Sequence, residues 1–552
     1  MAATGPPIPT AETLAGNSTA IAVWTIVSRL TGFVRIAVIA AVLGPTYFGS
    51  LFLAINFLPM LALQFLAGSL VGSLLIPSLT PSIDRRDREA SDELAGGFLG
   101  AALVAFGAVA LLAVLAAPVI LAVLTIGVEN RDAAADQLKA GWILMALTMP
   151  QLVLYAVALI GGAVMNAHGR FRLAAAAPVA ENLGVMLTMI AAAVTFGTGK
   201  DIDAVSTGEL LLLGAGSTVA VALHAGVMTW GARRSGVRMR PRRGWRIPAV
   251  RVLIRRLAAS LGQSGLASGR FFAMLTVANT VPGGVVAFRL ALNFLYLPVQ
   301  VGAQPITMTV LPTLARLHNA GRAQEFREAC ARSVARICFL VAPATVGYLA
   351  LSEPLAQASA FGAMAGSAGP ALVAACLAGT ALAVMGESGV QLFTNAFYAR
   401  NDARSPFFAA VAGTAITLAC LPVALRLDGS SALLVVGLAL SAGTSFSTWL
   451  MWHRLHATLP PPQHGATRSV LRSLAASAVM AAPTYFVSTA LADRLGGPVG
   501  ALAGVIAGTL LGAGVFIAIQ RLWRSPELAF FAGGVRGLTK RPADRPRIRI
   551  SP

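Results

Sequence analysis

The sequence predicts an all-α polytopic membrane protein with about fourteen transmembrane helices. Its residues are 56% hydrophobic and only 12% charged, whereas soluble domains are about 25% charged. The apolar residues form long stretches, and about 20 such residues suffice for a helix to cross a bilayer core of about 30 Å. Arginine falls almost entirely in every second break between these stretches, as expected if alternate breaks face the same side.

In chain order, the helices are expected at residues 17–43, 46–79, 96–127, 141–167, 173–197, 208–231, 257–280, 283–316, 332–361, 370–398, 405–426, 431–453, 473–492 and 498–521. Each range is a mainly apolar stretch that a short polar break separates from the next. The preceding segment lacks the basic start and cleavage site of a secretory signal. The first helix is therefore expected to remain as a membrane anchor.

The distribution of arginine predicts the orientation of the chain. Breaks after odd-numbered helices are short and neutral or, at 127–139 and 197–209, net acidic. Breaks after even-numbered helices and the C-terminal tail carry Arg85, Arg86, Arg88, Arg170, Arg172, a dense run at 233–256, Arg316, Arg322, Arg327, Arg400, Arg404, Arg454, Arg468, Arg472, Arg536, Lys540, Arg541, Arg545, Arg547 and Arg549. Basic loops stay in the cytoplasm, so both termini are expected there. The net charge of +20 thus indicates contact with anionic membrane lipids and not with nucleic acid.

A weak internal repeat predicts two similar lobes. Residues 75–79 (LIPSL) recur about 230 positions later as 310–314 (VLPTL), and the Asn-Ala pair at 166–167 recurs at 395–396, as in duplicated transporters. The expected organisation is an N-terminal tail (1–16), a six-helix lobe (17–231), a basic cytoplasmic linker (232–256), a second six-helix lobe (257–453), a cytoplasmic loop (454–472), two appended helices (473–521) and a basic cytoplasmic tail (522–552).

Four arginines lie well inside the predicted membrane spans, away from their ends: Arg29, Arg35, Arg270 and Arg289. An arginine at the bilayer centre costs about 2.5–3.5 kcal/mol on insertion scales, so it normally faces a wet cavity or a partner. Guanidinium groups stay charged and donate paired hydrogen bonds to phosphate. The four guanidinium groups together would form an anion-binding site between the two lobes. Alternatively, some lie near helix ends and contact lipid phosphates.

Two acids are expected to be buried within the spans. Glu181 and Glu387 are expected either to pair with an arginine or to be protonation sites that couple transport to an ion gradient. His224 is expected to be a hydrogen-bonded helix residue and not a proton relay. The chain has no GxxxxGK[ST] loop, and no catalytic triad or metal-ligand cluster stands out. A transporter is expected, without a cofactor or metal, driven by the membrane potential or an ion gradient, and not an enzyme.

Five segments carry a family resemblance: 28–44 (SRLTGFVRIAVIAAVLG), 161–182 (GGAVMNAHGRFRLAAAAPVAEN), 295–317 (LYLPVQVGAQPITMTVLPTLARL), 352–362 (SEPLAQASAFG) and 392–406 (LFTNAFYARNDARSP). In this order they resemble the MurJ (MviN) lipid II flippases of the multidrug/oligosaccharidyl-lipid/polysaccharide (MOP) exporter superfamily. The resemblance implies alternating access in a bacterial inner membrane. It also implies a cationic cavity for the diphosphate-sugar headgroup and a groove between the last two helices for the polyprenyl tail. Arg29 and Arg35 match the family's first-helix arginines.

The chain departs from the family pattern at several cavity positions. Ile36 and Gly49 stand where the family has acids, and Leu63 or Gln64 replaces a basic residue. Asn293 aligns with an expected arginine, and Arg289 lies one turn earlier.

These departures leave other functions open: a flippase for another polyprenyl-diphosphate-linked oligosaccharide, a drug/cation antiporter, or a non-transporting scaffold for wall synthesis. The expected partners are the glycolipid, membrane lipids including anionic ones, and cell-wall synthesis proteins.

Overall fold

The computed structural model describes residues 11–67, 76, 78–83, 85, 87–366, 368–461 and 466–539. Helices make up almost all of this part of the chain, and it contains no strand. Thirteen of the described helices are long and apolar enough to cross a membrane. The predicted all-α membrane fold is therefore confirmed. The seventh predicted helix is the continuous helix α10 (Pro248–Ala278), which is not among these thirteen.

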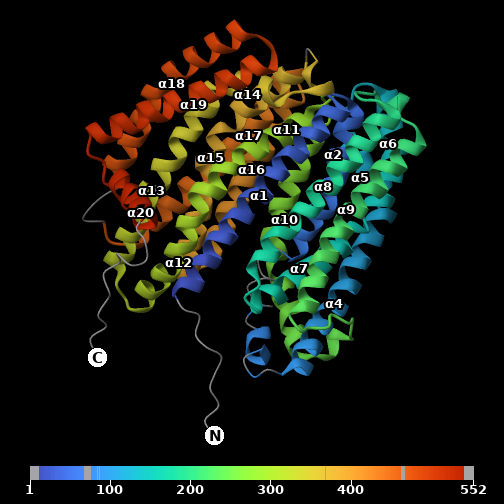
Figure 1. The fold of residues 1–552 in the computed structure, drawn as a ribbon, viewed down its shortest axis with the longest axis horizontal. Coiled ribbons are helices and arrows are strands. Elements are labelled where there is room, and N and C mark those ends of the chain that lie inside the picture. Colours follow the sequence, from blue (N-terminus) through green and yellow to red (C-terminus); the bar gives the residue numbers. More distant parts are fainter. Residues whose placement is uncertain are drawn as a thin grey trace. The chain divides into compact units, whose positions relative to one another are not determined.

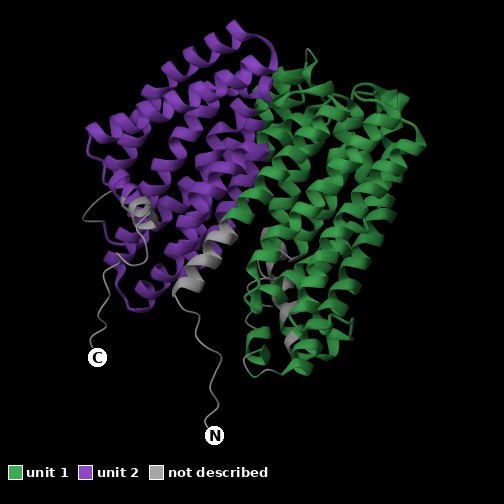
Figure 2. Ribbon diagram, in the orientation of Figure 1, with its two compact units in different colours: residues 1–291, 359–376, 418–436 green, residues 292–358, 377–417, 437–552 purple. Residues whose placement is uncertain are grey.

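The described residues form two compact units (Figure 2). Unit 1 takes its residues from 1–291, 359–376 and 418–436, and unit 2 takes its residues from 292–358, 377–417 and 437–552. Helices α11, α15, α16 and α17 have residues in both units, as does α14 through its last residue, Ser359. These units are defined by packing and not by the internal repeat, so the division into lobes at 17–231 and 257–453 stays a prediction.

Unit 1 is a bundle of long helices (Figure 1). Besides α10 and the first half of α11 (Gly284–Pro298), it contains α1 (Ala11–Leu43), α2 (Tyr47–Ala67), α4 (Arg88–Leu115), α5 (Ala117–Leu124), α6 (Arg131–Thr148), α7 (Gln151–Ala167), α8 (Phe171–Phe196) and α9 (Thr207–Arg234). Helix α8 packs against both α1 and α9, and α9 also packs against α6 and α7. Their contact region includes a core of Met165, Ala177, Ala225 and Met228.

Unit 2 contains most of the later helices: α12 (Gln304–Asn319), α13 (Ala323–Ala350), α14 (Ser352–Ser359), α15 (Gly369–Ala399), α16 (Arg404–Ala424), α17 (Gly429–Thr458), α18 (Thr467–Leu495), α19 (Gly497–Leu522) and α20 (Pro526–Thr539). Five residues of π-helix, Val299–Ala303, separate α11 from α12. Helix α20 was not predicted from the sequence, because it lies in the segment expected only as a basic tail. It packs through Phe531, whose ring lies 5.5 Å from that of Phe339 on α13.

Some expectations fall outside the described residues. The second predicted helix, 46–79, is described as α2 and as isolated helical positions near its end, whereas 68–75 and 77 lie outside. Part of the first repeat motif at 75–79 lies outside for this reason. So do residues 1–10 of the N-terminal tail and 540–552 of the C-terminal tail.

Part of the basic linker is an ordered segment that packs along α4, whereas the sequence indicated only a charged connection. We call residues 235–247 the linker segment. The backbone N–H of Arg238 donates to the Asp92 carboxylate at 2.7 Å, and that of Arg242 donates to the Gly96 carbonyl at 2.9 Å. These bonds fix the segment against the first turns of α4.

The loop before α16 illustrates how a helix begins. The Asp402 carboxylate accepts hydrogen bonds from the backbone N–H groups of Arg404 and Ser405, at 2.9 and 3.0 Å, and from the Ser405 hydroxyl at 2.7 Å. Partial burial by itself raises the pKa of Asp402, but these bonds outweigh it and hold the pKa below its ordinary value of 3.8. The ionised carboxylate therefore caps the start of the helix.

Replacing Asp402 by Ala is expected to lower the free energy of unfolding by about 1 kcal/mol at neutral pH. Because the folded-state pKa is depressed, this stabilisation is present above the ordinary pKa and is lost as the pH falls through the folded-state pKa. Thermal unfolding of wild type and variant in detergent, from neutral pH to about pH 3, measures the difference. Asp402→Asn, which retains an acceptor, is the control. If the difference in free energy of unfolding between wild type and Asp402→Ala does not decrease as the pH falls, Asp402 is not an ionised helix cap.

Candidate functional site

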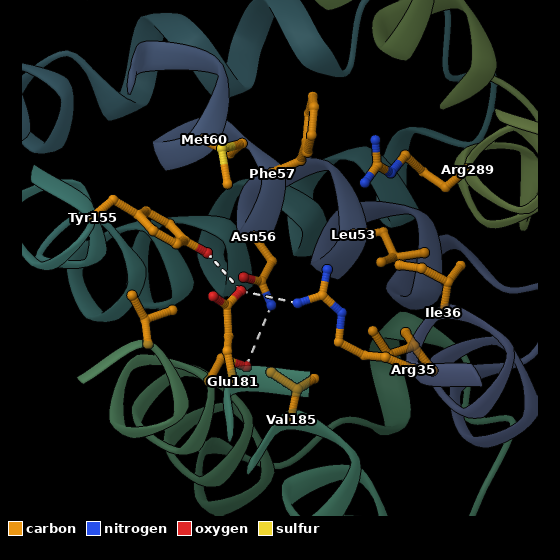
Figure 3. A pocket seen from close by; sticks show the side chains of 13 residues that line it. Arg35, Ile36, Leu53, Asn56, Phe57, Met60, Tyr155, Glu181, Val185 and Arg289 are labelled. Atoms are coloured by element: carbon orange, nitrogen blue, oxygen red, sulfur yellow. Dashed lines mark hydrogen bonds and ion pairs between the residues drawn. The ribbon is translucent and has the colours of Figure 1, made fainter. Parts of the chain in front are cut away.

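A pocket inside unit 1 brings together polar residues from six helices (Figure 3). It encloses about 170 Å³. We call it the Arg35 pocket, and it is lined by Arg35, Ile36 and Ile39 of α1, Leu53, Asn56, Phe57 and Met60 of α2, Tyr155 of α7, Glu181 and Val185 of α8, Ser217 and Val221 of α9, and Arg289 of α11.

Glu181 is the centre of the hydrogen-bond network. Its Oε1 accepts from Arg35 Nη1 and from the Tyr155 hydroxyl, both at 2.9 Å. Its Oε2 lies 2.9 Å from Nδ1 of His224. The Glu181 side chain is 9% exposed and that of Arg35 is 24% exposed. Three helices thus hold one buried carboxylate, which is the ion-pair alternative that the sequence left open.

Arg289 supplies a second cation to the same pocket. Its guanidinium lies 3.9 Å from the centre of the Phe57 ring, a cation–π contact that favours a cation within hydrocarbon. The Phe57 ring is in turn 5.0 Å from that of Phe271. The lining therefore has two guanidinium groups and a single carboxylate. Such a pocket has an excess of positive charge and suits an anion.

The neighbours of Glu181 explain how it is positioned. The adjacent Asn182 donates to the Thr31 hydroxyl at 2.9 Å and to the Ser28 carbonyl at 3.2 Å. These bonds fix the height of α8 against α1. On the other side, a Cβ on Gly184 would lie 2.7 Å from Cβ of Ala220. The absence of this atom lets α9 approach α8 closely enough for His224 to reach Glu181.

The predicted site residues do not all lie in this pocket. Arg35, Ile36, Glu181 and Arg289 all line it. Arg29 is exposed on α1, and Arg270 is half-buried on α10 beside Phe271; neither is among the described lining residues. Asn293 on α11 and Glu387 on α15 belong to unit 2.

Sequence reasoning missed Tyr155 and Asn56. Tyr155 is buried and donates to Glu181, and the amide of Asn56 donates to the Ser217 hydroxyl at 3.3 Å. The only sequence signal for either residue is a polar atom within an apolar stretch. His224, expected as an ordinary hydrogen-bonded residue, belongs to the same network.

Long apolar helices around a buried cationic pocket define a polytopic membrane protein with a candidate anion site. Solved structures share this fold. One, described as "Lipid II flippase MurJ, inward closed conformation", has a TM-score of 0.68 at 16% identity and covers 91% of this chain and 98% of that one. An inward-facing MATE family transporter of the MOP superfamily has a TM-score of 0.60 at 14% identity and covers 78% of this chain and 95% of that one.

The family model described as "Lipid II flippase MurJ" matches residues 39–496. This chain belongs to that family.

Two curated relatives carry the description "Probable lipid II flippase MurJ". The Vibrio cholerae protein is 24% identical over 345 residues, which are 61% of this chain and 63% of that protein, less than two thirds of its length. The Rhizobium meliloti protein is 25% identical over 468 residues, 84% of each chain. The similarity is low in identity but extends over most of the chain.

Proposed function

We propose that this chain is a flippase that moves lipid II, the undecaprenyl-diphosphate-linked peptidoglycan precursor, from the inner to the outer leaflet of the bacterial cytoplasmic membrane by alternating access. The observation that carries the proposal is the match of the lipid II flippase family model to residues 39–496. The cationic Arg35 pocket supports it, because a diphosphate group cannot cross hydrocarbon without groups that replace its hydration.

In this proposal Arg35 and Arg289 donate hydrogen bonds to the diphosphate. Each guanidinium presents a planar fork that matches two phosphate oxygens and stays charged in a site of low dielectric constant. The Phe57 ring holds Arg289 in place, and Glu181 holds Arg35. Glu181 also balances the Arg35 charge when no substrate is bound, which lowers the cost of keeping an arginine within the membrane.

Complementation of a strain depleted of its own lipid II flippase tests the proposal. Wild type is expected to restore growth, whereas Arg35→Ala and Arg289→Ala are expected to lower lipid II transport about tenfold or more each, since a charge-assisted bond is lost. Arg246→Ala, at an exposed position of the linker segment, is the matched control and is expected to rescue. Western blotting of membranes checks that every variant is inserted.

A second candidate is a flippase for a different polyprenyl-diphosphate-linked glycan. Ile36 favours it, because this apolar residue lines the Arg35 pocket where the family resemblance implies an acid. Inserted wild type that binds undecaprenyl diphosphate but does not restore growth would support this candidate over lipid II. Full rescue by both pocket variants would instead support a non-transporting role in wall synthesis.

A further inference from the structure

A second cationic concavity in unit 1 lies at the linker segment, outside the Arg35 pocket. It encloses about 520 Å³ and is lined by Arg88, Arg233, Gly236, Arg238, Met239 and Arg240. We call it the linker pocket. Arg88 begins α4, Arg233 lies in the last turn of α9, and the others belong to the linker segment. Four arginines from three parts of the chain therefore surround one space.

The backbone holds these arginines in a defined arrangement. Gly236, at φ +89°, ends the turn after α9, and the Val237 N–H donates back to the Ala232 carbonyl at 3.3 Å. Val237 and Met239 are only 2% and 8% exposed, whereas Arg238 and Arg240 between and after them are exposed. This alternation, which is typical of an extended segment, anchors the apolar side chains inward and leaves the guanidinium groups facing the pocket.

Glycines on α4 make this close packing possible. A Cβ on Gly96 would lie 2.2 Å from the Arg240 carbonyl oxygen, and one on Gly100 would lie 1.9 Å from that of Arg242. On the linker segment itself, a Cβ on Gly244 would lie 1.9 Å from the Gly97 carbonyl oxygen. Since real side chains do not tolerate these distances, the segment occupies a groove that only glycine can form.

The charge of the linker pocket is not balanced within the part of the chain that the structure describes. None of its four arginines forms an ion pair there, and the nearby Asp92 carboxylate accepts from a backbone N–H. Four like charges around one space repel one another unless an anion enters.

The position of the linker pocket limits the kinds of anion that can reach it. It lies where α4 begins and α9 ends, and both helices are candidate membrane spans. It is therefore at the level where lipid phosphates meet water.

We propose that the linker pocket binds a phosphorylated anion through Arg88, Arg233, Arg238 and Arg240. The phosphate belongs either to the headgroup of an anionic phospholipid or to a soluble phosphate compound. Guanidinium forks on several sides of a phosphate give paired hydrogen bonds as well as charge, which a diffuse basic surface does not. This site is separate from the Arg35 pocket and does not depend on what the chain transports.

Two triple variants with the same loss of charge test the proposal. The pocket triple is Arg233→Gln, Arg238→Gln and Arg240→Gln. The control triple is Arg234→Gln, Arg243→Gln and Arg246→Gln, from the same stretch but outside the pocket lining. The full-length protein in neutral detergent is titrated with phosphatidylglycerol in mixed micelles, with phosphatidylcholine as the uncharged comparison. A separate arm titrates it with inorganic pyrophosphate at constant ionic strength.

The pocket triple is expected to weaken binding at least about tenfold more than the control triple. A selective loss of phosphatidylglycerol binding supports a lipid headgroup, and a selective loss of pyrophosphate binding supports a soluble phosphate. Diffuse attraction to charge would weaken equally in both triples, and that result overturns the proposal. The proposal is also overturned if the wild type binds neither phosphatidylglycerol nor pyrophosphate.

A variant that keeps all the arginines gives an independent test. Gly100→Val is expected to push the linker segment off α4 and to lower binding as much as the pocket triple does. Gly107→Val on the same helix, where a Cβ would meet nothing within 4 Å, is the control. If the pocket triple does not fold, Arg238→Gln compared with Arg246→Gln gives the same contrast. If Gly100→Val and Gly107→Val bind the probes equally well, or if Arg238→Gln and Arg246→Gln do, the proposal is contradicted.

Discussion

Replacing Glu181 by Ala is expected to destabilise the protein by about 3–5 kcal/mol, the usual cost of removing one partner from a buried ion pair. The variant leaves the Arg35 guanidinium without its carboxylate and removes the acceptor of Tyr155. It also removes the partner of His224 Nδ1. The buried Nε2 of His224 has no hydrogen-bond partner among the described residues, so the ring would then have none at either nitrogen. Thermal or chemical unfolding of the purified protein measures the loss.

A double-mutant cycle separates the ion pair from the rest of the network. Arg35→Ala combined with Glu181→Ala is expected to cost less than the sum of the two single changes, with a coupling of about 1–3 kcal/mol. Tyr155→Phe, which removes a single neutral donor, is the milder comparison at about 1 kcal/mol. Strict additivity of the two charge removals would show that Glu181 does not stabilise Arg35.

Replacing Gly504 by Ala in α19 is expected to destabilise the packing of α19 against α18 by about 1–3 kcal/mol, the usual range for overpacking. A Cβ at this position would lie 2.4 Å from the backbone carbonyl oxygen of Ser488. Because a backbone atom cannot rotate away, the two helices have to move apart. Gly500 and Gly512 lie on the same face, since they are four and eight positions away. A Cβ at Gly500 would lie 2.7 Å from the Ala492 carbonyl oxygen, and one at Gly512 would lie 2.4 Å from the Thr484 hydroxyl.

Gly514 on the same helix supplies the matched control. A Cβ there would meet nothing within 4 Å. Gly514→Ala is therefore expected to leave the melting temperature unchanged or to raise it slightly, because alanine favours the helix by up to about 1 kcal/mol. The two variants differ in the sign of their effect, which thermal unfolding in detergent resolves. A similar loss of stability in both variants would contradict the explanation by contact with α18, because helix propensity alone favours alanine at both positions.

The membrane fold could be predicted because its signal is local. The length of an apolar run and the charges beside it are visible in a single stretch of sequence. Helix α20 was missed because the basic residues around it suggested an unstructured tail. The signal that could have revealed it is the pair Phe530 and Phe531, two large apolar residues within that tail.

The candidate site was predicted only in part, because its contacts join distant segments. The charges of Arg35 and Glu181 are conspicuous in apolar stretches, but the two residues are 146 positions apart in the chain and nothing local pairs them. Arg29 carried the same sequence signal as Arg35. Six residues turn a helix by roughly 120° relative to the starting direction, and the structure places Arg29 on an exposed part of α1. Similarly, the glycines of α4 gave no sign that they receive the linker segment.

The ion pair between Arg35 and Glu181 has a consequence for selectivity among anions. Any anion that approaches Arg35 has to compete with a carboxylate that is tethered 2.9 Å away and therefore acts at a high effective concentration. A small singly charged ion such as chloride offers Arg35 no more charge than Glu181 already does. A diphosphate brings more charge and several oxygens, and it can engage Arg289 in the same step. If the pocket receives a diphosphate as proposed, the internal carboxylate is expected to favour multivalent ligands over singly charged anions.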